Sequence, residues 1–117
     1  MQKARLRPED APVTPEAISI FLEGDHFVFR VGNASAIYFS DKDTVGKSNC
    51  DGACAAIWPP VSARAGATTV GDWTVVIRTD KSSQWAYKGK PVYTFADDVA
   101  GQATGEAGHP GWHIVKP

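Results

Sequence analysis

Short runs of β-branched and aromatic residues alternate with turn-forming residues along most of the chain. Residues 18–23 (ISIFLE) and 26–31 (HFVFRV) are two such runs, and Gly24-Asp25 between them is typical of a hairpin turn. Further runs follow at residues 36–40, 73–78, 84–87, 91–95 and 112–116. The pattern therefore predicts about seven short strands.

The remaining segments have other patterns. Residues 50–58 (CDGACAAIW) favour a short helical turn, which Pro59-Pro60 would end. Residues 1–16 are rich in proline and charge and lack periodicity, which indicates a flexible N-terminal lead-in. Residues 17–117 are expected to form a single β-rich domain, a small antiparallel sandwich or barrel with a helical turn near the two cysteines.

Composition and charge exclude some partner classes. The 117 residues carry 12 basic and 13 acidic side chains, a net charge of -1, so nothing favours a nucleic acid or an anionic membrane as partner. No apolar run approaches the roughly 20 residues that span a bilayer. The basic start MQKARLR is followed by PEDAPVTPE and not by the apolar segment of an export signal, as in a mature secreted domain that carries an added Met.

One short phrase occurs twice in the chain. IYFSDKD and VYTFADD are 55 positions apart, so that Tyr38, Asp43 and Gly46 correspond to the residues of the second copy, namely Tyr93, Asp98 and Gly101. A tyrosine buries its ring and needs a partner for its hydroxyl, an aspartate at a turn accepts backbone N–H groups, and a glycine takes a positive φ. The phrase therefore predicts two related β units, about 26–61 and 81–116, that leave the sheet through the same turn.

Calcium binding is the alternative interpretation of the first copy. The segment DKDTVGKSNCDG begins like a calcium-binding loop, with Asp41, Asp43 and Gly46 in suitable places. Val45 stands at the fifth position and Gly52 at the twelfth, where such a loop needs oxygen ligands. Turn formation is the preferred interpretation of these aspartates.

The two cysteines leave three interpretations open. Cys50 and Cys54 are four positions apart, which on a helical turn places their Cα atoms about 6 Å apart, within disulfide range. A structural disulfide, the favoured interpretation, implies an oxidising compartment. A redox-active pair lacks the usual Cys-x-x-Cys spacing, and a metal site would need two further ligands.

Histidines and tryptophans supply further candidates. His109 and His113 are four apart, but Pro110-Gly111 prevents a helix between them, so they remain a weak alternative for metal binding, with His26 on another strand. The chain holds four tryptophans: Trp58, Trp73, Trp85 and Trp112. Most are expected in the core, whereas an exposed aromatic cluster at Trp58 and Trp112, beside His113, would mark a ligand groove.

These residues carry a resemblance to a known family. The segments DKDTVGKSNCDGACAAIWPP, GDWTVVIR, QWAYKGKPVYTFADD and GWHIV resemble predicted bacterial secreted lipoproteins with a Tyr-x-(Phe/Trp/Tyr)-x-x-Asp motif, also described as secreted repeats of unknown function. Tyr93, Phe95 and Asp98 fit the motif in full. In the first copy Tyr38 and Asp43 fit, while Ser40 replaces the second aromatic residue.

The resemblance implies export to the periplasm or cell surface, often with a lipid anchor in the precursor, and no established enzymatic activity. The leading hypothesis is therefore a non-enzymatic, exported β domain of the cell envelope that binds a protein or a small ligand and needs no cofactor. The alternative is a periplasmic redox or metal-handling protein that uses Cys50 and Cys54 with a nearby histidine. An enzyme whose site the sequence does not reveal is the third hypothesis, because no paired catalytic carboxylates or nucleophile motif stands out.

Overall fold

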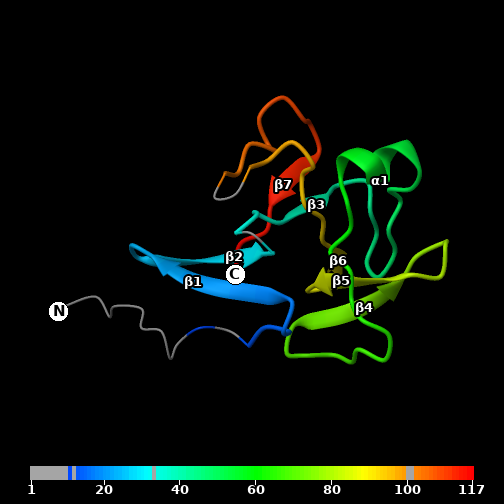
Figure 1. Cartoon of the computed structure of the whole chain (residues 1–117), viewed down its shortest axis with the longest axis horizontal. Helices are drawn as coiled ribbons and strands as arrows, with labels where there is room; N and C mark the ends of the chain where they lie inside the picture. Colours follow the sequence, from blue (N-terminus) through cyan, green and yellow to red (C-terminus); the bar gives the residue numbers. More distant parts are fainter. Residues whose placement is uncertain (1–10, 12, 33, 100–101) are drawn as a thin grey trace.

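A computed structural model of the chain describes residues 11, 13–32, 34–99 and 102–117 (Figure 1). These residues form the mostly β fold that the sequence predicts, with one short helix near the two cysteines. The elements in chain order are β1 (Ile18–Glu23), β2 (His26–Val31), β3 (Tyr38–Ser40), α1 (Ala53–Ile57), β4 (Trp73–Ile77), β5 (Ser83–Tyr87), β6 (Lys90–Pro91) and β7 (Trp112–Ile114). Residues 1–10 and 12 of the expected lead-in lie outside the described part.

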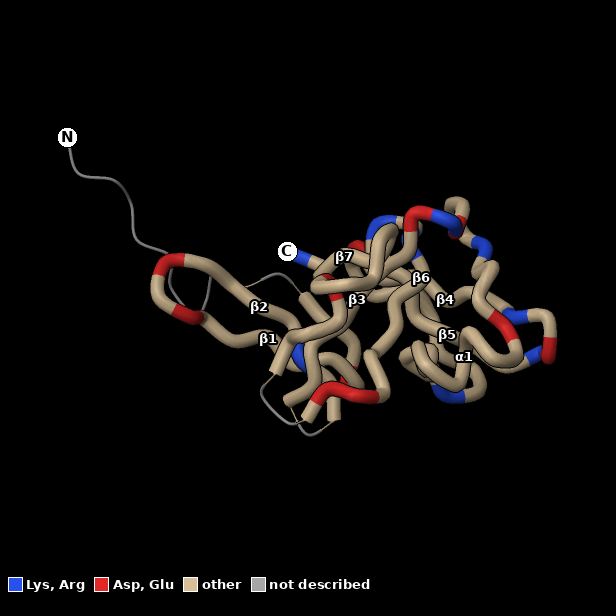
Figure 2. Tube along the Cα trace, turned by 90° about the horizontal axis from the view of Figure 1, so that it is seen from above, with Lys and Arg blue, Asp and Glu red and all other residues tan. Residues whose placement is uncertain are grey.

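The strands form three small antiparallel sheets with the orders β1-β2, β3-β7 and β4-β5-β6. Within the described ranges these sheets do not close into a barrel. The hairpin β1–β2 extends away from the other strands, as Figures 1 and 2 show from two directions. Its bounds are those that the sequence predicts, because Glu23 pairs with His26 across the turn and Gly24 adopts the positive φ of 63° that a tight turn requires.

The base of the hairpin packs against the three-stranded sheet. Phe29 of β2 contacts Trp73 and Tyr87 edge-to-face, with ring centroids 5.0 Å apart in both pairs. Trp73 is fully buried between them, and its ring centroid lies 4.8 Å from that of Tyr87. Each such aromatic pair adds about 0.5–1.5 kcal/mol to the stabilisation from burial. This cluster fixes the hairpin to β4 and β5.

A row of four backbone segments crosses the centre of the molecule. Tyr38 and Tyr93 exchange both backbone hydrogen bonds at 2.8 Å, so the two copies of the repeated phrase lie antiparallel and side by side. On the outer sides, Tyr38 pairs with Ile114 of β7 and Tyr93 pairs with Pro60. The row therefore runs Pro60, Tyr93, Tyr38, Ile114. Tyr93 lies beside Pro60, near the end of the first repeat unit, and Tyr38 lies beside Ile114, near the end of the second.

This row explains why the expected strand at residues 91–95 is shorter than predicted. β6 ends at Pro91, and Val92 still donates to the Trp85 carbonyl at 3.0 Å. The next residue, Tyr93, leaves the three-stranded sheet to pair with Tyr38. The segment is extended, but its partners change along its length.

Candidate functional site

The two repeated tyrosine–aspartate motifs are connected crosswise. The Tyr38 hydroxyl donates a hydrogen bond of 2.6 Å to Asp98 Oδ2, and the Tyr93 hydroxyl donates one of 2.6 Å to Asp43 Oδ2. Each tyrosine thus binds the aspartate of the other motif and not that of its own. The interpretation of the repeated phrase as a purely local turn missed this exchange. The exchange joins residues that are far apart in the chain, by 60 positions for Tyr38 and Asp98 and by 50 positions for Tyr93 and Asp43.

The second oxygen of each aspartate holds the loop that follows it. Asp43 Oδ1 accepts the backbone N–H of Asn49 at 2.7 Å, and Asp98 Oδ1 accepts that of Thr104 at 2.8 Å. Both donors stand six positions after their aspartate. Gly46, in the first of these loops, has a φ of 73°, and Gly101, its counterpart, lies outside the described residues. Each carboxylate therefore joins its own loop to the opposite tyrosine.

The two hydroxyl groups are completed by different partners. The Tyr93 hydroxyl shares a short hydrogen bond with the buried Ser48 hydroxyl. The Tyr38 hydroxyl instead accepts the backbone N–H of Gly105 at 3.0 Å. A Cβ atom on Gly105 would lie 2.8 Å from the Tyr38 ring and 2.9 Å from that of Trp58, so a larger residue would displace both rings. The loop after Asp98 therefore contacts its tyrosine through the backbone of a glycine, whereas the loop after Asp43 contacts its tyrosine through the Ser48 side chain.

Burial raises the pKa of both tyrosines. Desolvation, followed by the hydrogen bond to Asp43, raises the pKa of Tyr93 from 10.0 to about 12. Desolvation and the hydrogen bond to Asp98 also raise the pKa of Tyr38. Burial raises the pKa of Asp98, but the hydrogen bonds from Thr104 and Tyr38 outweigh this effect and lower it below its ordinary value. The hydroxyl groups stay protonated and the Asp98 carboxylate stays charged, which suits structural hydrogen bonds and not a nucleophilic tyrosine.

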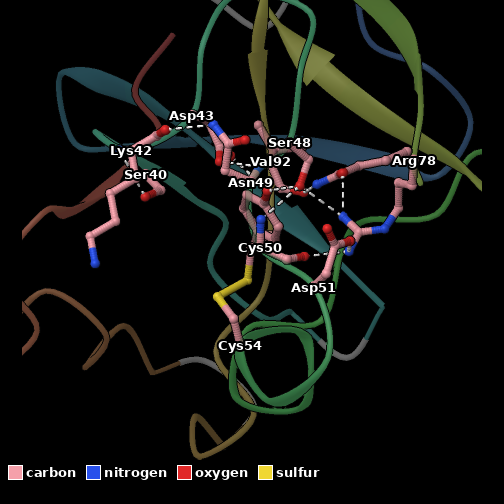
Figure 3. Close-up of a disulfide and its surroundings, with 12 residues drawn as sticks. Ser40, Lys42, Asp43, Ser48, Asn49, Cys50, Asp51, Cys54, Arg78 and Val92 are labelled. Carbon is pink, nitrogen blue, oxygen red and sulfur yellow. Dashed lines mark hydrogen bonds and ion pairs between the residues drawn. A yellow bond between two sulfur atoms is a disulfide. The ribbon is translucent and has the colours of Figure 1, made fainter. Parts of the chain in front are cut away.

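A buried arginine supports the first loop (Figure 3). The Arg78 side chain is 4% exposed, and its guanidinium donates to Ser48 Oγ at 3.1 Å and Gln84 Oε1 at 2.7 Å. It also donates to the Cys50 carbonyl and, at 3.3 Å, to Asp51 Oδ1. Because Ser48 contacts the Tyr93 hydroxyl, the hydrogen bonds run from Arg78 through Ser48 and Tyr93 to Asp43.

Arg78 was not among the candidates from the sequence. Val76 and Arg78 are buried, whereas Ile77 between them is 62% exposed. The end of β4 therefore places Ile77 outward, and Arg78 directly after the strand lies inward, the reverse of what residue type favours. The two-residue period of a strand does not decide this direction from the sequence, because it groups Arg78 with buried Val76 but groups exposed Ile77 with buried Trp73.

Cys50 and Cys54 form a disulfide, as the favoured interpretation predicts. The described part contains no free cysteine. The bridge joins the buried loop residue Cys50 to α1, whose last turn is closed by a hydrogen bond from the Trp58 N–H to the Cys54 carbonyl at 2.8 Å. A closed loop of this size stabilises the fold by only about 2 kcal/mol in the chain-entropy description. Its main effect is to fix the loop that carries the Cys50 carbonyl over Arg78.

The tryptophans proposed as a ligand groove are used for packing. Trp58 is 4% exposed, and its ring stacks on that of Trp112 with centroids 3.9 Å apart and planes 4° from parallel. Tyr38 packs edge-on against Trp58, and Tyr93 packs edge-on against Trp112, which repeats the same contact in both halves. Phe95 also stacks on Trp58, at 4.7 Å. These rings form the core under the crossed hydrogen bonds.

The three histidines lie in separate surroundings. His109 packs edge-on against Trp58 and Phe95. His113 lies near Phe39, and its Nε2 is 2.8 Å from Asp41 Oδ2. His26 lies beside Asp25 at the hairpin turn. Among the described residues no group of three or more histidine, cysteine, aspartate or glutamate side chains is placed to hold a metal ion.

Comparison with known proteins supports the resemblance found in the sequence. Residues 74–116 match the family described as "Secreted repeat of unknown function". The match covers the second copy of the motif and its surroundings, and it confirms the recognised resemblance. No curated protein and no solved structure matches the chain. No helix in the described part is long and apolar enough to cross a membrane.

Replacement of Arg78 by alanine should lower the free energy of unfolding by about 3–5 kcal/mol, because three buried acceptors lose their donor. Arg78→Lys should restore only part of this loss, since an ammonium group cannot reproduce the planar fork of donors. Urea denaturation of the variants measures both effects. The matched control is Arg64→Ala: this side chain is 82% exposed, its partner Glu16 is 3.9 Å away, and the change should be below about 1 kcal/mol. Equal losses for Arg78→Ala and Arg64→Ala would contradict the assigned role.

Alkaline pH should destabilise the protein through its buried tyrosines. An unfolded tyrosine ionises near pH 10, whereas Tyr93 in the fold does so near 12, so its contribution to stability is complete below pH 10 and is lost as pH rises through 12. Urea unfolding curves at several pH values in this window measure the loss. The Tyr38→Phe/Tyr93→Phe variant should be less stable at neutral pH and lose less on going to high pH. An identical alkaline loss in wild type and variant would show that other groups cause it.

Proposed function

We propose that this protein is a non-enzymatic, exported β module of the bacterial cell envelope, acting as a binding or structural unit. It consists of two related β units, about residues 26–61 and 81–116, that fold as one domain. The observation that carries the proposal is the crossed pair of tyrosine–aspartate hydrogen bonds, in which each unit supplies the partner that the other needs. Two units joined in this way make a rigid scaffold that presents its outer surfaces to a partner.

The use of the reactive side chains supports a non-enzymatic role. Tyrosine, aspartate, serine and arginine are residues that catalytic sites employ, and the structure does gather Tyr93, Asp43, Ser48 and Arg78. In this cluster the tyrosine and serine hydroxyls bond to other protein groups, and the tyrosine pKa rises where activation of a nucleophile would lower it. The hydrogen bonds of this cluster hold the first loop against Tyr93.

The disulfide and the family description support an exported location. Disulfides persist in oxidising compartments such as the bacterial periplasm and the cell surface. The Cys50–Cys54 bridge fits those compartments, and the family matched by residues 74–116 is described as secreted. We place the protein in the periplasm or on the cell surface, with a lipid anchor in its precursor.

The redox or metal-handling alternative has less support. Cys50 is 2% exposed, which hinders attack of an exchanging thiol on its sulfur and leaves the partly buried Cys54 sulfur as the more accessible one. His109 and His113 differ in their neighbours and do not form a described metal cluster with the cysteines. A structural bridge accounts for Cys50 and Cys54 without a further partner.

The proposal is tested by expressing the complete reading frame in a bacterial host and fractionating the cells. Thiols are trapped at lysis with a mass-tagged maleimide in denaturant without reductant, and the tag is counted by mass. The protein should appear in the envelope or periplasmic fraction with no tag, because both cysteines are bridged. Cys54→Ser is the matched control, since it leaves one thiol and should gain one tag. A cytosolic protein with two tags would contradict the proposal, and a bridge that glutathione readily reduces in the purified protein would favour the redox alternative.

A further inference from the structure

A groove lies between the projecting hairpin and the C-terminal strand. It is lined by residues 26–30 on β2, by Ala103, and by residues 114–117 at and after β7, and its volume is about 830 Å³. This volume is within the range of 300–1,000 Å³ that ligand sites in proteins occupy. The residues that line the groove do not include the tyrosines and aspartates of the crossed cluster.

The β2 wall presents backbone groups that have no strand beside them among the residues that the structure describes. Within residues 13–32, 34–99 and 102–117, β1 is the strand that pairs with β2, so the other edge of β2 has no strand partner in this part of the chain. Val31 exchanges hydrogen bonds of 3.0 and 2.9 Å with Ser35, so its backbone groups point away from β1. Because this direction alternates along an antiparallel strand, Phe29 and Phe27 direct their N–H and C=O groups to the same side as Val31. A free strand edge of this kind is a template for another strand.

The opposite wall has the same property in part. Val115 donates its N–H to the Ile37 carbonyl at 2.9 Å, toward β3. By the same alternation Ile114 and Lys116 direct their backbone groups away from β3. The Ile114 N–H is bound by Glu106 Oε2 at 2.8 Å, which leaves the carbonyl of Ile114 and the backbone groups of Lys116 on that side.

The side chains of the groove define the chemistry of an occupant. The apolar lining comes from both walls and comprises Phe27, Val28, Phe29, Ile114 and Val115. The charged or titratable side chains that line it are His26, Arg30 and Lys116, and none of the lining residues is acidic. Glu23 lies 3.7 Å from Arg30 and Asp25 lies 3.3 Å from His26, so these two carboxylates offset part of the positive charge and Lys116 is the main cation of the lining. The groove therefore suits an occupant with apolar groups and carboxylates and disfavours a basic one.

We propose that the groove binds an extended, acidic and partly apolar polypeptide segment of another protein, which adds to the free edge of β2 as a third strand. About five residues of such a strand span the groove wall at roughly 3.3 Å per residue. Main-chain hydrogen bonds to Phe27 and Phe29 supply affinity, and the alternating side chains meet the apolar lining on one side. This inference rests on the proposed function, since it names the surface and the partner class of a binding module.

The test uses an end-blocked synthetic peptide, Glu-Val-Thr-Val-Glu-Val, whose binding to the purified protein is followed by calorimetry and by backbone NMR. The peptide should bind saturably, with the largest amide shifts and slowed exchange at Phe27, Phe29 and Lys116. Two control peptides separate the causes: methylation of alternate backbone nitrogens should weaken binding at least about tenfold, and replacement of both glutamates by lysine should weaken it as well.

Two proline variants provide a matched pair on the protein side. Leu22 and Phe27 are register partners on the hairpin, and their free backbone N–H groups point to opposite edges. Proline at an edge position with a free N–H is tolerated in strands. Phe27→Pro should abolish binding, whereas Leu22→Pro should leave it within about twofold. The NMR shifts of the wild-type protein keep the test decisive if either variant fails to fold.

Several results would overturn the inference. They are the absence of saturable binding at peptide concentrations up to about 1 mM, equal binding of the N-methylated peptide, and equal loss in the two proline variants. A dimer in solution that Phe27→Pro converts to a monomer would assign the groove to a second copy of the chain instead. The export experiment is independent of these outcomes, so a failed peptide test would remove the groove assignment and leave the proposed location standing.

Discussion

The exchange of aspartates between the two tyrosine motifs is the constraint on which the rest of the structure depends. Tyr38 and Tyr93 pair through their backbones and then reach past each other, each to the carboxylate that begins the other loop. A hydrogen bond from a buried donor to a carboxylate is worth about 1.5–3 kcal/mol, and leaving such a group unpaired costs a similar amount. In the fold, each half supplies the aspartate for the tyrosine of the other half. The crossing therefore makes folding of the two halves cooperative, and it sets the positions of the Trp58–Trp112 stack and of β7.

The two halves finish the same arrangement by different means. In the first, Ser48, the Cys50–Cys54 bridge and the buried Arg78 hold the loop against Tyr93. In the second, the backbone of Gly105 approaches Tyr38 directly, and His109 packs on Trp58. Gly105 and His109 stand 55 positions after Cys50 and Cys54. The first half thus holds its loop with a disulfide and a buried arginine, whereas the second brings the backbone of Gly105 close to Tyr38. Because the supporting residues differ, the sequence repeat is short although the two hydrogen-bond arrangements match.

Local features were predictable from the sequence. The hairpin β1–β2 has its predicted bounds because its turn and its β-branched runs are specified within the continuous segment Ile18 to Val31. The helical turn and the disulfide also follow from local spacing. The repeated phrase identified the residues of the crossed cluster but not their pairing, since a tyrosine in a repeat can bind the aspartate of either copy. The early end of β6 and the inward direction of Arg78 depend on partners far along the chain, and no local pattern specifies those partners. The groove beside β2 was not foreseen for the same reason, because its two walls come from opposite ends of the described chain.

A double-mutant cycle on Tyr38 tests the crossing most directly. Tyr38→Phe is combined once with Asp98→Ala and once with Asp43→Ala, and the free energies of unfolding of all variants are measured with urea. The crossed arrangement predicts a coupling energy of about 1–3 kcal/mol between Tyr38 and Asp98, and additivity within about 0.5 kcal/mol between Tyr38 and Asp43. Coupling of Tyr38 to Asp43 with additivity toward Asp98 would show that each motif closes on itself and would contradict the account.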